Sequence, residues 1–151
     1  MDRETDGTLT DTYVAAIQHD RADVPDDATL VGVVRKPTQW FHAAVDENRA
    51  ALAPSAELLE TFRTSVDDLK MRGICAEGAH NAAWGEVGFE AAYREHLEES
   101  ADARAALADV VDRLEGGESL ALVCYENTDK KRCHRTVLRD VLETEGAEVR
   151  D

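Results

Sequence analysis

Residues 118–125, ESLALVCY, form the most strand-like segment of the chain, because they are mostly apolar and follow a helix-breaking glycine pair at 116–117. Before this segment, apolar residues recur at helical spacing after Ser100, a residue type that caps helices, and predict a helix containing Leu107, Val110, Val111 and Leu114. After it, a last helix that Gly146 ends is predicted from Val137, Leu138, Val141 and Leu142. A buried strand between two helices is typical of an α/β fold.

The rest of the chain continues this alternation of strands and helices. Further strands are predicted at residues 12–19, 28–37, 72–76 and, as an edge strand, 147–150. One further helix is predicted over residues 55–70 with Ser55 as its N-cap, and another contains Phe89, Ala92, Tyr93 and Leu97. We therefore predict a single α/β domain over residues 1–151, three-layered and Rossmann-like with a mostly parallel sheet, in which residues 1–11 are flexible.

The composition is strongly acidic, with 32 acidic against 17 basic side chains and a formal net charge of -15. Phosphate contacts need Lys and Arg, so we do not expect general nucleic-acid binding. Few lysines and abundant Asp and Glu are typical of a salt-adapted, haloarchaeal-like organism, where high salt screens self-repulsion. No apolar run approaches the ~20 residues that cross a bilayer, and the N-terminal stretch is unlike a signal peptide. We therefore expect a cytoplasmic protein with no membrane partner, and three cysteines, an odd number, fit a reducing compartment.

A local basic patch stands out against this acidic background. Residues 129–139, DKKRCHRTVLR, contain five basic side chains and one acidic side chain. If the last helix begins near Cys133, then His134 and Arg135 lie in its first turn with that cysteine. There the unpaired N–H groups and the helix dipole favour anions and lower the pKa of a thiol. We predict that Cys133 and His134 are catalytic residues and that Arg135 binds the ligand, because its guanidinium is a bidentate fork for phosphate or carboxylate.

Three more residues are predicted to join this site from the ends of strands. Cys124 and Glu126 leave the 118–125 segment two positions apart, so the pleat directs both side chains to the same side. Arg35 follows the earlier predicted strand, and ligands of parallel sheets bind beyond the carboxyl ends of the strands. We predict a catalytic acid/base role for Glu126, and ligand-binding roles for Arg35 and Cys124.

Each candidate also has an interpretation without function. Cys124 can be a small buried residue, Glu126 a helix cap or ion-pair partner, and His134 a solvated surface histidine. Zinc accepts Cys, His and Glu, but the spacing is not that of structural zinc sites, and adjacent Cys133 and His134 reach one ion with difficulty. We therefore expect no metal, and no cofactor, since phosphate-binding and dinucleotide-binding glycine motifs are absent. A Cys124–Cys133 redox pair is an alternative that the sequence does not support further.

A second polar cluster lies at residues 75–84, CAEGAHNAAW. His80 and Asn81 could line a pocket with Trp84 as an apolar wall. A capped loop with a packed tryptophan is the preferred interpretation, because most such loops carry no site.

The C-terminal third of the chain resembles the domain-of-unknown-function 488 (DUF488) family. The signature of that family is an apolar strand, C-x-E, a short loop and C-H-R at the start of a helix. In this sequence it falls on Cys124, Glu126, Cys133, His134 and Arg135. An early strand of the family ends in D-V-R, where this chain has Val33, Val34 and Arg35, so the arginine matches and the acid does not. The resemblance implies an α/β domain with a polar site at the strand ends, and it implies no particular reaction.

These patterns lead to two hypotheses about function. The first is an enzyme or enzyme-like domain that binds an anionic small molecule, either a nucleotide or a phosphorylated metabolite. The second is a non-catalytic nucleotide-sensing or regulatory module that uses the same residues. A network that only fixes the last helix is a third interpretation, and the sequence predicts no oligomeric state.

Overall fold

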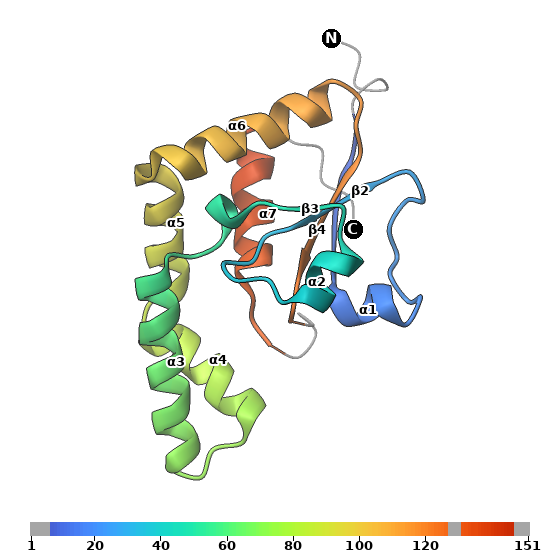
Figure 1. Ribbon diagram of the computed structural model, residues 1–151. Helices are drawn as coiled ribbons and strands as arrows, with labels where there is room; N and C mark the ends of the chain where they lie inside the picture. The colour runs from blue at the N-terminus through green and yellow to red at the C-terminus, as the bar shows by residue number, and fades with distance from the viewer. Residues whose placement is uncertain (1–6, 127–130, 147–151) are drawn as a thin grey trace.

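In the part of the chain that the structure describes, four parallel strands form a sheet in the order β1-β4-β2-β3 (Figure 1). This computed structural model describes residues 7–126 and 131–146. Its strands are β1 (Leu9–Tyr13), β2 (Thr29–Gly32), β3 (Glu47–Asn48) and β4 (Leu120–Cys124). Every strand pairing is parallel, which confirms the predicted α/β fold, and the strand predicted at 118–125 lies inside the sheet.

β4 is buried along its whole length because it has a neighbouring strand on each edge. It pairs with β1 from Leu9–Leu120 to Tyr13–Cys124 and with β2 from Thr29–Leu120 onward. Each of its five residues is 1% exposed or less. A strand covered on both faces has a continuous apolar sequence, which is why β4 was the clearest strand to predict.

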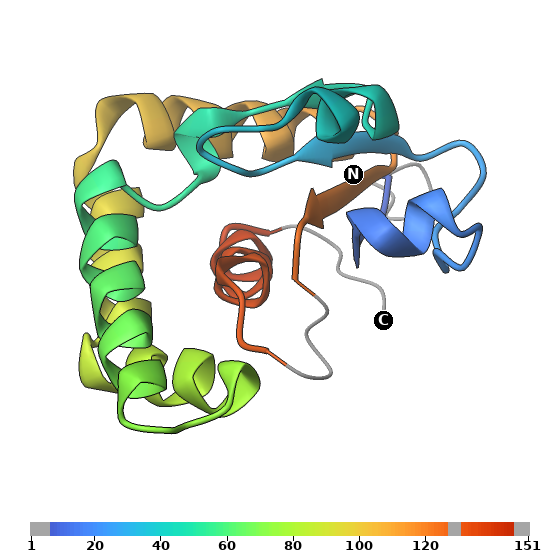
Figure 2. The same ribbon diagram turned by 60° about the horizontal axis from the view of Figure 1, so that its bottom comes forward.

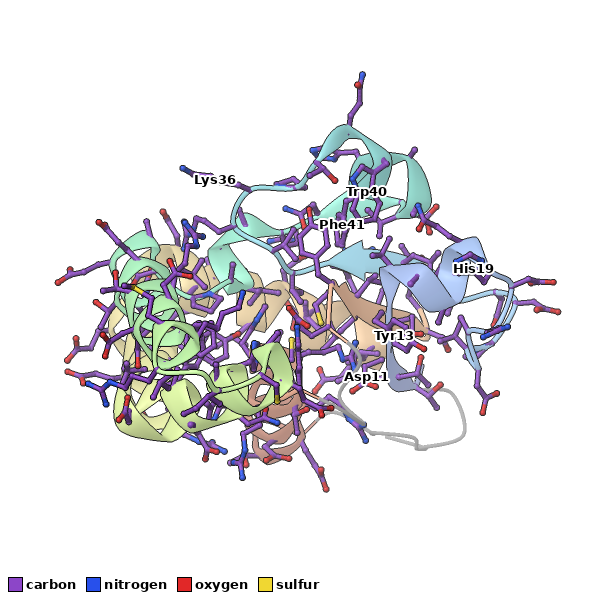
Figure 3. All side chains as sticks on the ribbon, turned by 90° about the horizontal axis from the view of Figure 1, so that it is seen from below. Asp11, Tyr13, His19, Lys36, Trp40 and Phe41 are labelled. Atoms are coloured by element: carbon purple, nitrogen blue, oxygen red, sulfur yellow. The ribbon has the colours of Figure 1, made fainter. Side chains whose placement is uncertain are left out.

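Helices cover both faces of the sheet, which gives the three layers that were predicted. Figures 1 and 2 show α1 (Val14–Gln18) and α7 (His134–Thr144) on opposite sides of the sheet, and α2 (Gln39–Ala44) packs beside α1. The elements between β3 and β4 are η2 (Ala50–Leu52), α3 (Ala56–Met71), α4 (Ala76–Glu86), α5 (Phe89–Glu99) and α6 (Ala101–Glu115). Figure 2 shows α7 end-on between β4 and the wall that α3 and α5 form. The first turn of α7 is therefore enclosed by protein.

The helix caps follow the sequence closely. Ser55 Oγ accepts the Leu58 N–H at 3.1 Å, and Ser100 Oγ accepts the Ala103 N–H at 3.2 Å, as predicted. Each such cap stabilises its helix by ~1 kcal/mol. Gly146, with φ of 107°, follows the end of α7, also as predicted.

Several sequence-based assignments were wrong. The strand predicted at 12–19 ends at Tyr13 and continues as α1, while its beginning moves back to Leu9, because Leu9 is fully buried beside Leu120. Positions 9–11, predicted to be flexible, therefore lie in β1. Residues 72–76 form no strand: α3 ends at Met71, Gly73 turns the chain with φ of 94°, and Cys75 caps α4. The edge strand predicted at 147–150 lies outside the described residues. Within residues 7–126 and 131–146, no helix has the length and apolar character that a bilayer span requires.

Candidate functional site

The end of β4 and the start of α7 bring two cysteine side chains into contact. Cys124 is the last residue of β4 and Cys133 is the N-cap of α7. Their Sγ atoms lie 2.8 Å apart, and both thiols are free. Cys124 is 1% exposed and Cys133 is 5% exposed, so the pair is enclosed. The fold therefore joins two of the predicted site residues directly.

The two thiols differ in acidity although they touch. A hydrogen bond from Cys124 lowers the pKa of the Cys133 thiol; burial opposes this shift, and the backbone N–H and guanidinium of Arg135 add to it. Burial, followed by the Cys133 thiol, raises the pKa of Cys124 well above its usual value. The site therefore favours a thiolate at Cys133 and a protonated thiol at Cys124, as expected where one sulfur lies at a helix N-terminus.

Arg135 lies inside the protein, with only 2% of its side chain exposed. Its Nη1 donates to the Thr12 carbonyl, to the Glu126 carbonyl at 3.4 Å and to Cys124 Sγ at 3.4 Å. The Asp11 carboxylate lies 3.7 Å from its Nε. Arg135, predicted to hold a ligand by its fork, thus links β1, the end of β4 and α7, and places its charge beside the thiols.

His134 is partly buried, and its contacts favour a neutral imidazole. Its Nε2 lies 2.6 Å from the Val33 carbonyl, so Nε2 carries the proton and donates it. The lone pair of Nδ1 is then directed to Cys133 Sγ, 3.7 Å away. Burial lowers the pKa of His134, with a smaller contribution from Arg135, and the ring packs edge-on against Tyr93. The arrangement can accept a proton from the Cys133 thiol.

Glu126 joins the cluster mainly through its backbone. Its carbonyl accepts from Cys124 Sγ at 3.6 Å as well as from Arg135. Its carboxylate lies 3.9 Å from Lys131 Nζ and is about one-third exposed. The acidic group is therefore directed to Lys131, whereas the sequence had suggested Lys130 or Arg132 as its partner. Lys130 lies outside the described residues.

Arg35 contacts a different part of the chain from the other predicted site residues. Its Nε donates to the Pro54 carbonyl at 3.0 Å and its Nη2 to the Ala53 carbonyl at 3.4 Å. Burial and, next, the Arg35 charge lower the pKa of His96 on α5. These contacts join Arg35 to the η2–α3 connection and to α5. By contrast, the sulfur pair touches His134 and Arg135.

The second polar cluster holds the chain in front of Cys133. His80 Nε2 donates to the Arg132 carbonyl at 2.6 Å, and Asn81 Oδ1 accepts the Arg132 N–H at 3.0 Å. Both side chains come from α4, so this helix fixes the backbone one residue before the cap of α7. In the sequence, a pocket lined by His80 and Asn81 was the less favoured interpretation. No local pattern indicated their partner Arg132, which lies 52 and 51 positions away. Trp84 stacks on Phe89 with 4.2 Å between the ring centroids, so the predicted packing of this tryptophan is confirmed. The predicted loop is wrong, because the cluster lies on helix α4.

Two other features concern metal binding and a cleft. Among the described residues, no group of three His, Cys, Asp or Glu side chains is placed to hold a metal ion. A cleft of about 340 Å³ opens between α5, α6 and α7, with Val141, Thr144 and Glu145 in its wall. These residues lie at the far end of α7, so the cleft is separate from the cysteine pair.

Comparison with known proteins yields a family. A family model described as the active DUF488-N3 subclade, DUF488-N3a, matches residues 12–146. The match runs from β1 to just beyond α7 and includes both cysteines of the site. No curated protein and no solved structure matches the chain.

Proposed function

The chain belongs to the DUF488 family, and we propose that it is an enzyme that uses Cys133 to act on an anionic small molecule, a nucleotide or a phosphorylated metabolite. The observation that carries this proposal is the position of Cys133. Cys133 is the N-cap residue of α7, and its sulfur contacts both Cys124 and the Nδ1 side of His134. The description of the matched subclade as active supports a catalytic role over a structural one.

The proposed chemistry is attack by the Cys133 sulfur. The thiol proton passes to Nδ1 of His134, and the sulfur forms a bond to an electrophilic atom of the bound anion. The leaving group departs with the bonding electrons and takes the proton back from His134. The N–H groups of the first turn of α7 favour the negative charge of the substrate.

The other predicted residues have supporting roles in this proposal. Arg135 favours the Cys133 thiolate by its charge, and the Cys124 thiol stabilises it by hydrogen bonding. The Glu126 carboxylate, beside Lys131, is a second acid/base group for water or product. Arg35 remains the candidate for an outer contact with the anion, held by its bonds to carbonyls 53 and 54.

One observation favours a second function, a non-catalytic binding module that senses a nucleotide. Both thiols are at least 95% buried, which suits a structural sulfur pair as well as a nucleophile. The same helix N-terminus would then bind the anion without covalent chemistry.

Thiol reactivity separates the two functions. The reduced protein is treated with iodoacetamide over a range of pH, and the label on each cysteine is measured by peptide mass. The enzyme proposal predicts that Cys133 is labelled well below the ordinary thiol pKa of ~8.5, and that Cys133→Ser removes this reaction. Cys75, which is exposed, is the internal reference for labelling.

Ligand binding is tested separately by calorimetry with nucleotides and phosphorylated metabolites. The proposal predicts that an anion binds wild-type protein and protects Cys133 from iodoacetamide. Binding without an acidic, reactive Cys133 would support the sensing module. If no anion binds and Cys133 reacts as an ordinary thiol, both functions are wrong.

A further inference from the structure

We propose that Cys124 and Cys133 form a reversible intramolecular disulfide when the protein meets a peroxide, so that the site has a two-electron redox activity. The inference rests on the position of the two sulfur atoms. It can be tested whether or not Cys133 attacks an anionic substrate.

The distance between the sulfurs is set by the fold. At 2.8 Å, the Sγ atoms are only about 0.8 Å farther apart than the sulfurs of a disulfide. Cys124 is fixed in the central strand, between β1 and β2. Cys133 is fixed by α7 on one side and by the α4 contacts to Arg132 on the other. A disulfide would therefore need a small movement of the side chains and no rearrangement of the sheet.

The surroundings give the two sulfurs different parts in the reaction. Cys133 lies at the helix N-terminus, where a thiolate is favoured, and thiolates react with peroxides. Cys124 keeps its proton and lies in contact with the first sulfur, which is the arrangement of a resolving cysteine. The Arg135 guanidinium, 3.4 Å from Cys124 Sγ, favours negative charge on that sulfur when it loses its proton.

The chemistry balances with hydrogen peroxide as the oxidant. The Cys133 thiolate attacks one peroxide oxygen, the O–O bond breaks, and the departing hydroxide takes a proton to form water, leaving a sulfenic acid on Cys133. The Cys124 sulfur then attacks the Cys133 sulfur as its own proton leaves, and the S–O bond breaks to release a second water. The two sulfurs lose two electrons in total and the peroxide gains two. A small dithiol such as dithiothreitol returns both thiols by exchange.

The third cysteine provides an internal control. Cys75 is exposed and caps α4, where its Sγ accepts a hydrogen bond from the Gly78 N–H at 3.3 Å. Labelling of the unfolded chain after oxidation therefore distinguishes the pair from this single thiol.

The experiment uses the full chain, reduced, freed of dithiothreitol and treated with one equivalent of hydrogen peroxide. After denaturation, the free thiols are counted with a maleimide and the peptides are identified by mass. We expect labelled thiols to fall from three to one, with the remaining label on Cys75, a peptide linking Cys124 to Cys133, and full recovery after dithiothreitol. Cys75→Ser, the matched variant, should fall from two labelled thiols to none.

Cys124→Ser should leave Cys133 as a sulfenic acid that dimedone traps. If this variant does not fold, the wild-type count decides alone. The proposal is wrong if three thiols remain, if the lost label is on Cys75 in a cross-linked dimer, or if Cys133 is oxidised while Cys124 stays free.

Discussion

Two helices of this protein begin with a cysteine, and the two cysteines have very different surroundings. Cys75 is exposed to solvent at the start of α4, and its Sγ accepts a hydrogen bond from the Gly78 N–H. Cys133 caps α7 inside the protein, against a second thiol and a histidine. The second residue after the cap also differs, since it is Glu77 in α4 and Arg135 in α7.

The comparison teaches that a helix N-terminus does not by itself make a reactive site. Both cysteines have the dipole and the unpaired N–H groups of a first turn. Among the described residues, the α7 cysteine is the one that also has neighbours from distant parts of the chain. These are the Cys124 thiol from β4, the α4 side chains that bind the Arg132 backbone, and the Thr12 carbonyl that accepts from Arg135. Burial then makes each of these interactions stronger than at the surface.

The largest effect is expected when Arg135→Met makes the α7 site more like the α4 site. The substitution leaves the Thr12 and Glu126 carbonyls and the Asp11 carboxylate without a buried cation. We expect the free energy of unfolding to fall by about 3 kcal/mol, measured by urea denaturation. Cys133 should also react with iodoacetamide only at higher pH, because the nearby positive charge is lost.

The matched control for this variant is Arg139→Met. Arg139 donates to the same Asp11 carboxylate at 3.0 Å but is 21% exposed. It should lower the free energy of unfolding by less than about 1 kcal/mol. Equal losses in the two variants would show that the burial of Arg135 contributes nothing.

An intermediate effect is expected from His134→Gln. Burial lowers the pKa of His134 in the folded protein, so the unfolded chain binds the proton more readily. The stability from this residue is complete above the unfolded pKa of ~6.5 and is lost as the pH falls from there toward the folded pKa. Glutamine cannot be protonated, so the variant should lose less stability between about pH 6.5 and 5 than wild type does.

The measurement is urea denaturation at several pH values. His96, whose pKa is also lowered by burial, leaves a residual slope of the same sign. His19→Gln, at an exposed position, is the control and should keep the wild-type slope. A slope that is the same in His134→Gln and wild type would contradict the buried neutral imidazole.

The sequence predicted the local parts of this site and missed the distant ones. Cys124, Cys133, His134 and Arg135 were grouped because a strand, a loop and a helix follow one another within a few residues. The inward direction of Arg135 depends on the Thr12 carbonyl, 123 positions away, and no local pattern contains that contact.

The fold shows the same division. The apolar periodicity and the cap residues predicted β4 and most of the helices. Residues 72–76 were predicted to be a strand, but Gly73 and the Cys75 cap make them a turn between two helices. Pairing with β4 likewise decided where β1 begins, and that information is not in residues 9–13 themselves.

A smaller effect is expected from Asn81→Ala, which removes a contact that fixes the backbone before Cys133 and leaves the side chains around the two sulfurs unchanged. The variant removes the acceptor of the Arg132 N–H and should cost about 1 kcal/mol of unfolding free energy. Because Arg132 precedes Cys133, we expect iodoacetamide to label Cys133 faster while the labelling rate of Cys75 is unchanged. Ser65→Ala, which removes an exposed bond to Glu86 between α3 and α4, should change neither rate.

The smallest effect is expected from Glu77→Arg, which gives the α4 site the charge of the α7 site. If charge and helix N-terminus together were enough, Cys75 should become as reactive toward iodoacetamide as Cys133. We expect the Cys75 rate to change by less than about fivefold, because a charge at an exposed first turn contributes only ~0.3–1 kcal/mol. Helix α4 should lose a similar amount of stability, since a carboxylate near its N-terminus is replaced by a cation. A Cys75 that matches Cys133 would show that buried neighbours are unnecessary and that one surface arginine makes the site.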